Sequence, residues 1–200
     1  MIGILNYGSG NITSLSNSLT EIGKKHILIN NPKEFKNIEK LIIPGVGSYH
    51  DAVKKIKKKN FFYEIKKFSE KKPILGICVG MQILSEKGFE DKKTKGLALI
   101  SGVVDKIYEK QKESHVGWNN LKIIKKNSIL FNKIEEKSDF YFVHSYSFET
   151  KYKSDISSNI YFNDKKLVGS IEKEHIFGVQ FHPEKSHKNG LKLLNNFCSL

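Results

Sequence analysis

The sequence contains no arginine, only two cysteines and one tryptophan, and it has no long apolar run. Two cysteines, Cys78 and Cys198, cannot build the disulfide framework of a small secreted domain, which favours a reducing compartment. Because no stretch approaches the roughly 18 apolar residues of a membrane-spanning helix, we expect no transmembrane segment. The N-terminus lacks the basic region of a signal peptide. These absences predict a soluble, cytoplasmic protein.

The missing arginine also affects how the net charge of +13 is interpreted, since all 34 basic residues are lysine. A positive excess is typical of nucleic-acid-binding proteins. However, arginine is the side chain that binds guanine and phosphate in a bidentate manner, and lysine runs such as residues 54–59 suit the solvated face of a helix. We therefore expect no nucleic-acid partner. The lysines either cover an ordinary surface or attract an acidic partner or a phosphate-bearing substrate.

The apolar content, 38% of 200 residues, is sufficient for one packed domain, and no repeat or linker divides residues 1–200. The first half alternates strand and helix patterns, which predicts a parallel sheet with helices on both faces. In the second half, strands follow one another through turns, so we expect the sheet to gain antiparallel members. The predicted fold class is α/β, with one mixed and mostly parallel sheet.

Short apolar runs and helical spacing locate the expected elements. The expected strands are residues 1–6, 26–30, 41–43, 73–78, 103–108, 121–124, 140–143, 167–171 and 176–181. The first expected helix starts at Ile12 and is stopped by Gly23, and a second is capped by Ser48. Two further helices are expected over residues 80–87 and 188–200.

The segment Gly76-Ile77-Cys78-Val79-Gly80 is the sharpest local signal. It has the form of the nucleophile elbow G-x-S-x-G with cysteine in place of serine, between an expected strand and an expected helix. The flanking glycines leave room for the strained turn, and a helix N-terminus favours the reactive thiolate. Most free cysteines are small core residues, which is our interpretation of Cys198. For Cys78 the pattern predicts a nucleophile.

A cysteine nucleophile needs a base and a group that orients the base. In His182-Pro183-Glu184 the proline keeps its neighbour extended, so the side chains of His182 and Glu184 point the same way. The pair also follows an apolar strand, where sites on open α/β sheets form. By itself this pattern is more typical of a surface turn. Together with Cys78 it predicts a Cys-His-Glu triad.

The third motif, Pro44-Gly45-Val46-Gly47, follows another buried strand. Two glycines beside Val46 allow a main-chain N–H to point at a developing oxyanion without steric conflict. Alone, the motif indicates only a turn.

Taken together, these three motifs resemble those of the class I glutamine amidotransferase family. Within that family, residues 6–12, 115–119 and 141–146 are similar to blocks in the glutaminase subunits of imidazole glycerol phosphate synthase. The blocks occur in order from residue 3 to beyond residue 195. The resemblance therefore covers essentially the whole chain and implies the single-domain fold of that family.

The resemblance implies that Cys78 attacks the side-chain amide of glutamine, that His182 transfers the proton and that Glu184 orients His182. It places the oxyanion donors near Val46 and at Val79. The residues that it assigns to glutamine binding are Gly47, Gln82, Glu90, His144, Ser145 and Tyr146. Water would hydrolyse the thioester to glutamate. The ammonia would pass to a (β/α)₈ cyclase subunit that makes imidazole glycerol phosphate and an aminoimidazole carboxamide ribotide.

The same resemblance assigns Asn11, Trp118 and Lys185 to the interface with that cyclase subunit. For Trp118, a place in the core and an exposed docking position both remain open. A flexible oxyanion loop would give weak glutaminase activity until a loaded partner binds. No organic cofactor is implied. No metal is implied either, because no Cys/His cluster has ligand spacing.

Two departures from the family pattern leave alternatives open. Val79 stands where leucine is common, which matters little for a main-chain donor, and Ser114 stands where proline is common, in the loop expected to face the partner. Paralogues in the family supply ammonia for the amidination of a surface-polysaccharide sugar, and the motifs do not separate the two pathways. A non-catalytic basic binding module would have lost part of the triad. A cysteine peptidase has no need of glutamine-binding residues, so the match at Gln82 and residues 144–146 argues against that class.

Overall fold

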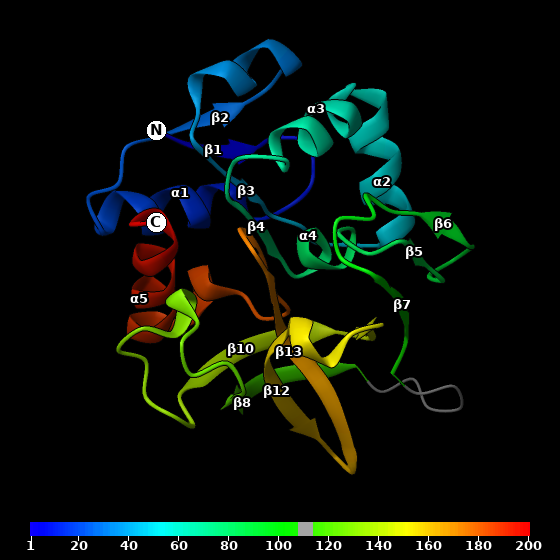
Figure 1. Ribbon diagram of the computed structural model, residues 1–200, viewed down its shortest axis with the longest axis vertical. Helices are drawn as coiled ribbons and strands as arrows, with labels where there is room; N and C mark the ends of the chain where they lie inside the picture. Colours follow the sequence, from blue (N-terminus) through cyan, green and yellow to red (C-terminus); the bar gives the residue numbers. More distant parts are fainter. Residues whose placement is uncertain (108–113) are drawn as a thin grey trace.

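The computed structural model describes residues 1–107 and 114–200, so the end of the expected strand 103–108 lies outside the described residues. An eight-stranded sheet in the order β2-β1-β3-β4-β14-β13-β12-β9 forms the centre of the molecule (Figure 1). Its parallel strands are β1 (Ile2–Leu5), β2 (His26–Ile29), β3 (Lys40–Ile43), β4 (Ile74–Ile77) and β14 (Ile176–Val179). Its antiparallel strands are β13 (Lys165–Lys173), β12 (Ile156–Phe162) and β9 (Lys122–Ile123). The expected mixed sheet is confirmed.

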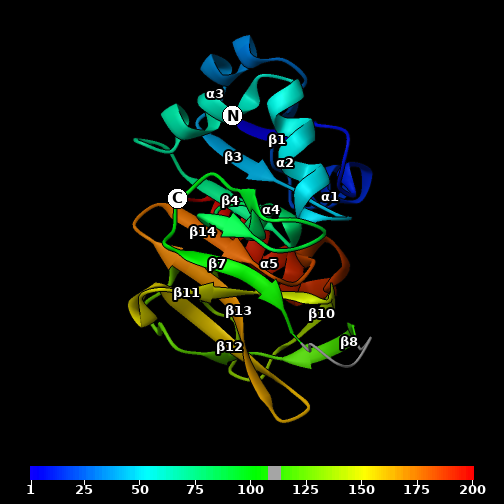
Figure 2. The same cartoon turned by 90° about the vertical axis from the view of Figure 1, so that its right-hand side faces the viewer.

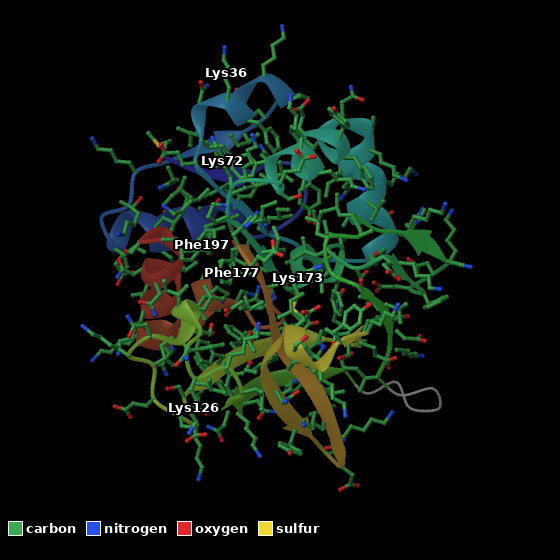
Figure 3. All side chains as sticks on the ribbon, in the orientation of Figure 1. Lys36, Lys72, Lys126, Lys173, Phe177 and Phe197 are labelled. Carbon is green, nitrogen blue, oxygen red and sulfur yellow. The ribbon has the colours of Figure 1, made fainter. Side chains whose placement is uncertain are left out.

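Helices cover both faces of the parallel strands, as expected. Figure 1 shows α1 (Ile12–Glu21) and α5 (His187–Cys198) on one side, and α2 (Tyr49–Lys58) and α4 (Val79–Gln82) on the other, with α3 (Phe61–Phe68) beside α2. The amphipathic pattern of α5 turns Phe197 inward, where its ring meets Phe177 of β14 edge to face at 6.1 Å (Figure 3). The 3₁₀ helices are η1 (Pro32–Asn37), η2 (Ile129–Phe131), η3 (Lys153–Asp155) and η4 (Pro183–Lys185).

The capping and stop residues expected from the sequence lie at helix ends in the structure. The Ser48 side chain accepts a hydrogen bond from the N–H of Asp51 and caps α2. Gly23 adopts a φ of +69° directly after α1, a conformation that glycine reaches without steric cost. Within the described ranges, no helix has the length and apolar character needed to cross a bilayer.

Two expected strands do not join the central sheet. β10 (Asp139–His144) pairs only with β8 (His115–Asn120), and β7 (Gly102–Lys106) lies in a four-stranded sheet with β11 (Tyr146–Thr150), β5 (Lys87–Gly88) and β6 (Thr94–Lys95). In Figure 2, β11 lies beside β13 and β8 lies beside β12. The alternating side chains of β10 account for its separate position. The rings of Phe140 and Phe142 pack on the ring of Phe181, with centroid distances of 4.2 and 5.5 Å, so β10 packs through its side chains and does not extend the edge of the central sheet. The strands β5, β6, β8, β11 and β12 and the helix α3 lie outside the elements expected from the sequence.

The expected helix over residues 80–87 is also wrong, because α4 ends at Gln82. The carbonyls of Ile83 and Ser85 accept hydrogen bonds from the N–H groups of Leu97 and Ala98, at 2.8 and 2.9 Å. These hydrogen bonds hold the chain after Ile83 against a returning loop, where the expected helix would have added another turn. A returning loop that is distant in sequence stops the helix.

The lysines are distributed over the surface rather than gathered on one face. Lys36 and Lys126 lie at opposite ends of the molecule (Figure 3). Other lysines contact main-chain oxygens, such as Lys59 Nζ with Asn6 O at 2.7 Å and Lys72 Nζ with Ile38 O at 2.6 Å. This distribution favours the interpretation of the lysines as ordinary surface.

The main chain of α4 lies directly against β3. A Cβ atom at Gly80 would lie 1.8 Å from Ile43 O, and one at Gly76 would lie 2.5 Å from Gly80 O. No side chain larger than hydrogen fits at either position without moving backbone. Glycine is thus required on both sides of Cys78 by packing as well as by the turn.

We expect Gly80→Ala to lower the free energy of unfolding by about 3 kcal/mol or more, because the backbone must move to relieve the overlap. The control is Gly23→Ala, where a Cβ would meet nothing within 4 Å. That control should cost only about 1 kcal/mol, for the left-handed conformation. Urea unfolding of both variants tests this, and equal losses would contradict it.

Candidate active site

Cys78 lies at the carboxyl edge of the central sheet, between two neighbouring parallel strands. It follows β4 directly, and its N–H donates to Val179 O, the last carbonyl of β14, at 2.8 Å. Its φ of 53° and ψ of −114° are unusual for a residue with a side chain, and α4 begins at the next residue. This strand–cysteine–helix geometry is the predicted nucleophile elbow.

His182 and Glu184 form the predicted pair. His182 Nδ1 and Glu184 Oε1 are 2.9 Å apart, and both side chains are 4% exposed. Burial acts to lower the pKa of His182, but the interactions with the neighbouring Cys78 and Glu184 outweigh it and raise that pKa to about 10. Since Nδ1 is taken by Glu184, Nε2 is the nitrogen available to Cys78. The imidazole is therefore held ready to carry a proton beside the sulfur.

The short helix η4 is anchored to β10, which positions this pair. The N–H of His182 donates to Tyr141 O at 2.9 Å. Ser186 Oγ donates to His182 O at 2.7 Å and accepts from the N–H of Tyr141 at 3.0 Å. The extended backbone of His182, with φ −101° and ψ 95°, agrees with the effect expected of Pro183.

A cavity of about 300 Å³ opens at Cys78 and brings the predicted residues together. The predicted catalytic and oxyanion residues that line it are Cys78, His182, Val46 and Val79. The predicted substrate-binding residues that line it are Gly47, Gln82, Glu90, His144, Ser145 and Tyr146. Glu184 lies behind His182. A larger hollow of about 980 Å³ is lined by Glu184 and Trp118 but not by Cys78, so the smaller cavity is the candidate active site.

Hydrogen bonds hold the loop that carries Val46 against the residues after β1. The Tyr7 hydroxyl donates to Pro44 O at 2.7 Å, and the Ser9 hydroxyl donates to Val46 O at 2.5 Å. The Val46 side chain is 43% exposed, so the loop is at the surface. On the other side of the cavity, Val79 opens α4, and its N–H has no acceptor within the helix.

The carboxylate of Glu90 is held at the rim of the cavity. The N–H of Tyr49, at the start of α2, donates to Glu90 Oε2 at 2.7 Å. Burial raises the pKa of Glu90, and the hydrogen bond from Tyr49 partly opposes that rise. This arrangement leaves the other carboxylate oxygen for a positively charged ligand group.

The side-chain amide nitrogen of Gln82 donates hydrogen bonds to two acceptors. Its Nε2 donates to Tyr146 O at 3.0 Å and to Gln180 Oε1 at 3.1 Å. Its carbonyl oxygen is therefore the atom that it can offer to a substrate. Sequence reasoning missed Gln180, which contacts Cys78. The signal available was its position directly after β14, two residues before His182.

His115 and His144 form a hydrogen-bonded pair that the sequence analysis does not predict. His144 Nδ1 donates to Tyr146 O at 2.8 Å, so its Nε2 accepts from His115 Nδ1 at 3.1 Å. His115 Nε2 then accepts from Asn119 Nδ2 at 3.2 Å. Burial lowers the pKa of His115 to about 4 and that of His144 to about 3. Both rings are neutral, and both nitrogens of His144 are occupied.

The three predicted interface residues have different surroundings. Asn11 caps α1 by accepting from the N–H of Ser14. Trp118 is 48% exposed and its ring stacks on His187 at 5.1 Å, which resolves its position in favour of the surface. Lys185 lies over the Tyr141 ring at 5.6 Å and lines both the active-site cavity and the larger hollow.

The sequence matches a known protein family. Residues 3–199 match the family described as "Glutamine amidotransferase class-I". The chain belongs to the class I glutamine amidotransferases. Among residues 1–107 and 114–200, no three His, Cys, Asp or Glu side chains gather as metal ligands would.

Two curated relatives narrow the position of this glutamine amidotransferase within the family. The chain is 44% identical over 204 residues to imidazole glycerol phosphate synthase subunit HisH 1 of Campylobacter jejuni strain RM1221, covering 100% of both chains. It is 40% identical over 201 residues to imidazole glycerol phosphate synthase subunit HisH of Methanocaldococcus jannaschii, again covering 100% of both. The chain is an enzyme of the HisH group.

More distant solved structures share the amidotransferase fold. PurLQS from Thermotoga maritima superposes with a TM-score of 0.79 at 19% identity, covering 99% of this chain and 97% of that one. The glutaminase domain of Trypanosoma brucei CTPS with bound acivicin superposes with a TM-score of 0.62 at 15% identity, covering 99% and 93%. These likenesses establish the single-domain α/β fold.

The neutral histidine pair predicts a pH-dependent stability. In the unfolded chain His115 and His144 gain protons below about pH 6.5, whereas in the folded chain they stay neutral until about pH 4 and 3. The unfolded state thus binds more protons as the pH falls from 6.5 to 4. The free energy of unfolding should fall over this window by up to about 1.4 kcal/mol per pH unit for each histidine.

The variant His115→Phe removes one of these titrations while keeping an aromatic ring between Phe142 and Phe162, which flank His115 at 4.8 and 4.4 Å. We expect its unfolding free energy, measured in urea at pH 4.5, 5.5, 6.5 and 7.5, to decline less steeply with falling pH. The comparison uses the slope, since the lost hydrogen bond lowers stability at every pH. An unchanged slope would mean that folding does not shift the pKa of His115.

Proposed function

We propose that this chain is the glutaminase subunit of an imidazole glycerol phosphate synthase. It would hydrolyse glutamine to glutamate and pass the ammonia to a cyclase subunit in the cytoplasm. The observation that carries the proposal is the buried Cys78 at a strained elbow, beside the His182–Glu184 pair in a cavity lined by all six predicted substrate residues. The full-length relatives that bear this name support it.

The geometry suits a thioester mechanism. Cys78 gives its proton to His182 and its sulfur attacks the amide carbon of glutamine, while the N–H groups of Val46 and Val79 stabilise the oxyanion. The tetrahedral intermediate collapses, His182 returns the proton to the leaving nitrogen, and ammonia departs. Water then attacks the thioester, again giving a proton to His182, and glutamate leaves as Cys78 is restored. Glu184 stabilises the imidazolium at each stage.

The cavity walls suit the two ends of glutamine. The Glu90 carboxylate, bound on one side by Tyr49, would bind the α-ammonium group. The Gln82 carbonyl oxygen would accept from the substrate. Because both His144 nitrogens are occupied, the segment 144–146 would contribute main-chain groups together with the side chains of Ser145 and Tyr146. A volume of about 300 Å³ is at the small end for ligand sites, which favours a free amino acid.

The cyclase subunit would bind over the surface that carries Trp118, Lys185 and Asn11. Lys185 joins this surface to the active site, because it lines both hollows. An exposed aromatic ring beside a lysine is typical of an interface anchor. Ammonia released at Cys78 would leave towards this side.

We expect Cys78→Ala to lower glutamine hydrolysis by at least about 10³-fold while the protein stays folded, because no other group can form the thioester. Glu184→Gln should lower kcat by about 10²-fold or more, since the imidazolium loses its stabilising charge. Ammonia release by the purified chain with its cyclase measures both. Activity that survives in Cys78→Ala would refute the mechanism.

The same assay separates the two pathways. In the presence of the cyclase, its ribotide substrate should increase glutaminase activity strongly, and Cys78→Ala should abolish the increase. Hydrolysis that depends on Cys78 but ignores both cyclase and ribotide would instead support the amidination of a polysaccharide sugar.

We also expect Trp118→Ala to weaken binding of the cyclase by about 10-fold or more, because an exposed aromatic anchor loses its buried area on the partner. Tyr152→Ala is the matched control, since that ring is also 48% exposed but lies near η3. Titration of the cyclase by isothermal calorimetry compares the two variants. Equal affinities would place the interface elsewhere.

A further inference from the structure

Gln180 lies between the nucleophile and the substrate-binding wall of the cavity. It is 0% exposed and follows β14, the strand paired with β4. Its Nε2 donates to Cys78 Sγ at 3.7 Å, and its Oε1 accepts from Gln82 Nε2 at 3.1 Å. The main-chain N–H of Gln180 donates to Gly169 O at 2.9 Å, which holds the residue in place. The side chain therefore touches the reacting sulfur atom.

The network determines which end of the Gln180 amide faces the sulfur. Tyr146 O can only accept a hydrogen bond, so the Gln82 group that faces it must be the NH₂. The same NH₂ also faces Gln180, which must therefore present its oxygen to Gln82. This leaves the NH₂ of Gln180 directed at Cys78 Sγ. The carbonyl of Tyr146 therefore fixes the orientation of the Gln82 amide, and the Gln82 amide fixes the orientation of the Gln180 amide.

A buried amide N–H is costly unless it has an acceptor, and among the described residues Cys78 Sγ is the acceptor of Gln180 Nε2. A thiol is a weak acceptor, whereas a thiolate is a charged and much stronger one. The side-chain N–H of Gln180 therefore has a stronger acceptor when Cys78 is ionised. The thiol itself donates to Val143 O at 3.7 Å, a contact that favours the protonated sulfur. Gln180 offsets that preference.

We propose that Gln180 is a further catalytic residue, which stabilises the Cys78 thiolate by donating its side-chain N–H to the sulfur. The inference rests on the proposed role of Cys78 as the nucleophile. Gln180 moves no proton itself, since an amide cannot act as a base at neutral pH. The proton of Cys78 goes to His182, and Gln180 lowers the free energy of the anion that remains.

Two substitutions of Gln180 test the role of its side-chain N–H. Gln180→Glu keeps the shape of the side chain and an oxygen for Gln82, but it replaces the N–H that faces the sulfur by an oxygen. Gln180→Met keeps a similar length and removes both contacts. Ser157→Ala is the matched control, because Ser157 is equally buried and bonds Ser170 Oγ at 2.6 Å, two strands beyond β14.

The first readout is the pH dependence of Cys78 alkylation by iodoacetamide, followed by mass spectrometry of the Cys78 and Cys198 peptides. We expect the midpoint for Cys78 to move to higher pH by about one unit in Gln180→Met and further in Gln180→Glu. Burial raises the pKa of Cys198 to about 11, so its slow reaction serves as an internal reference. Ser157→Ala should leave the Cys78 midpoint unchanged.

The second readout is glutamine hydrolysis in the assembled complex. We expect kcat to fall by about 10-fold or more in both Gln180 variants, with KM for glutamine changed less than three-fold. An unchanged alkylation midpoint in folded Gln180→Met would overturn the role of Gln180. If the proposed nucleophile were wrong instead, Cys78→Ala would still hydrolyse glutamine, so the two failures are distinguishable.

A third measurement uses the natural Gln180 in case neither variant folds. The sequence contains three glutamines, so side-chain amide labelling gives a simple NMR spectrum. One amide signal should titrate with Cys78 in the natural protein and stop titrating in Cys78→Ala. If no glutamine signal responds to Cys78, the hydrogen bond to the sulfur does not exist in solution and the proposal is wrong.

Discussion

The main chain that follows Cys78 rests on the carbonyl oxygen of Ile43, with no side chain between them. This contact sets the height of α4 above the sheet and holds Cys78 at the carboxyl edge of β4. The loop after β3 then passes beside the start of α4, so Val46 and Val79 line one cavity with the sulfur. The elbow, the oxyanion loop and the cavity all depend on two backbones meeting at van der Waals distance.

Around the sulfur, buried polar groups are hydrogen-bonded in pairs, and among the described residues Glu184 Oε2 is left buried without a partner. His182 is held by Glu184, while the neutral His144 is held by His115 and by Tyr146 O. These hydrogen bonds hold the imidazole rings in fixed orientations. The cavity therefore presents oriented dipoles before a substrate arrives. Preorganised dipoles of this kind are the main source of transition-state stabilisation in many enzymes.

Much of the fold could be predicted from local patterns, because the parallel strands are continuous apolar runs and the helices have clear caps and stops. The expected helix over residues 80–87 failed because hydrogen bonds from the loop at residues 96–99 hold the chain after Ile83. β10 was placed in the wrong sheet because its alternation shows which face is buried but not which layer covers it. The candidate triad could be proposed from the sequence, since Cys78, and the pair His182 and Glu184, each belong to a motif with its own local geometry.

The sequence by itself therefore determined the fold class, the elbow at Cys78 and the pairing of His182 with Glu184, since each depends on residues adjacent in the chain. Only the tertiary structure decided that Gln180 touches Cys78, that His115 bonds His144, and that Trp118 lies at the surface. These contacts join residues 29 to 102 positions apart, or depend on which surface the fold leaves uncovered. Buried hydrogen bonds are directional, so they become apparent only when the folded backbone places donor and acceptor together.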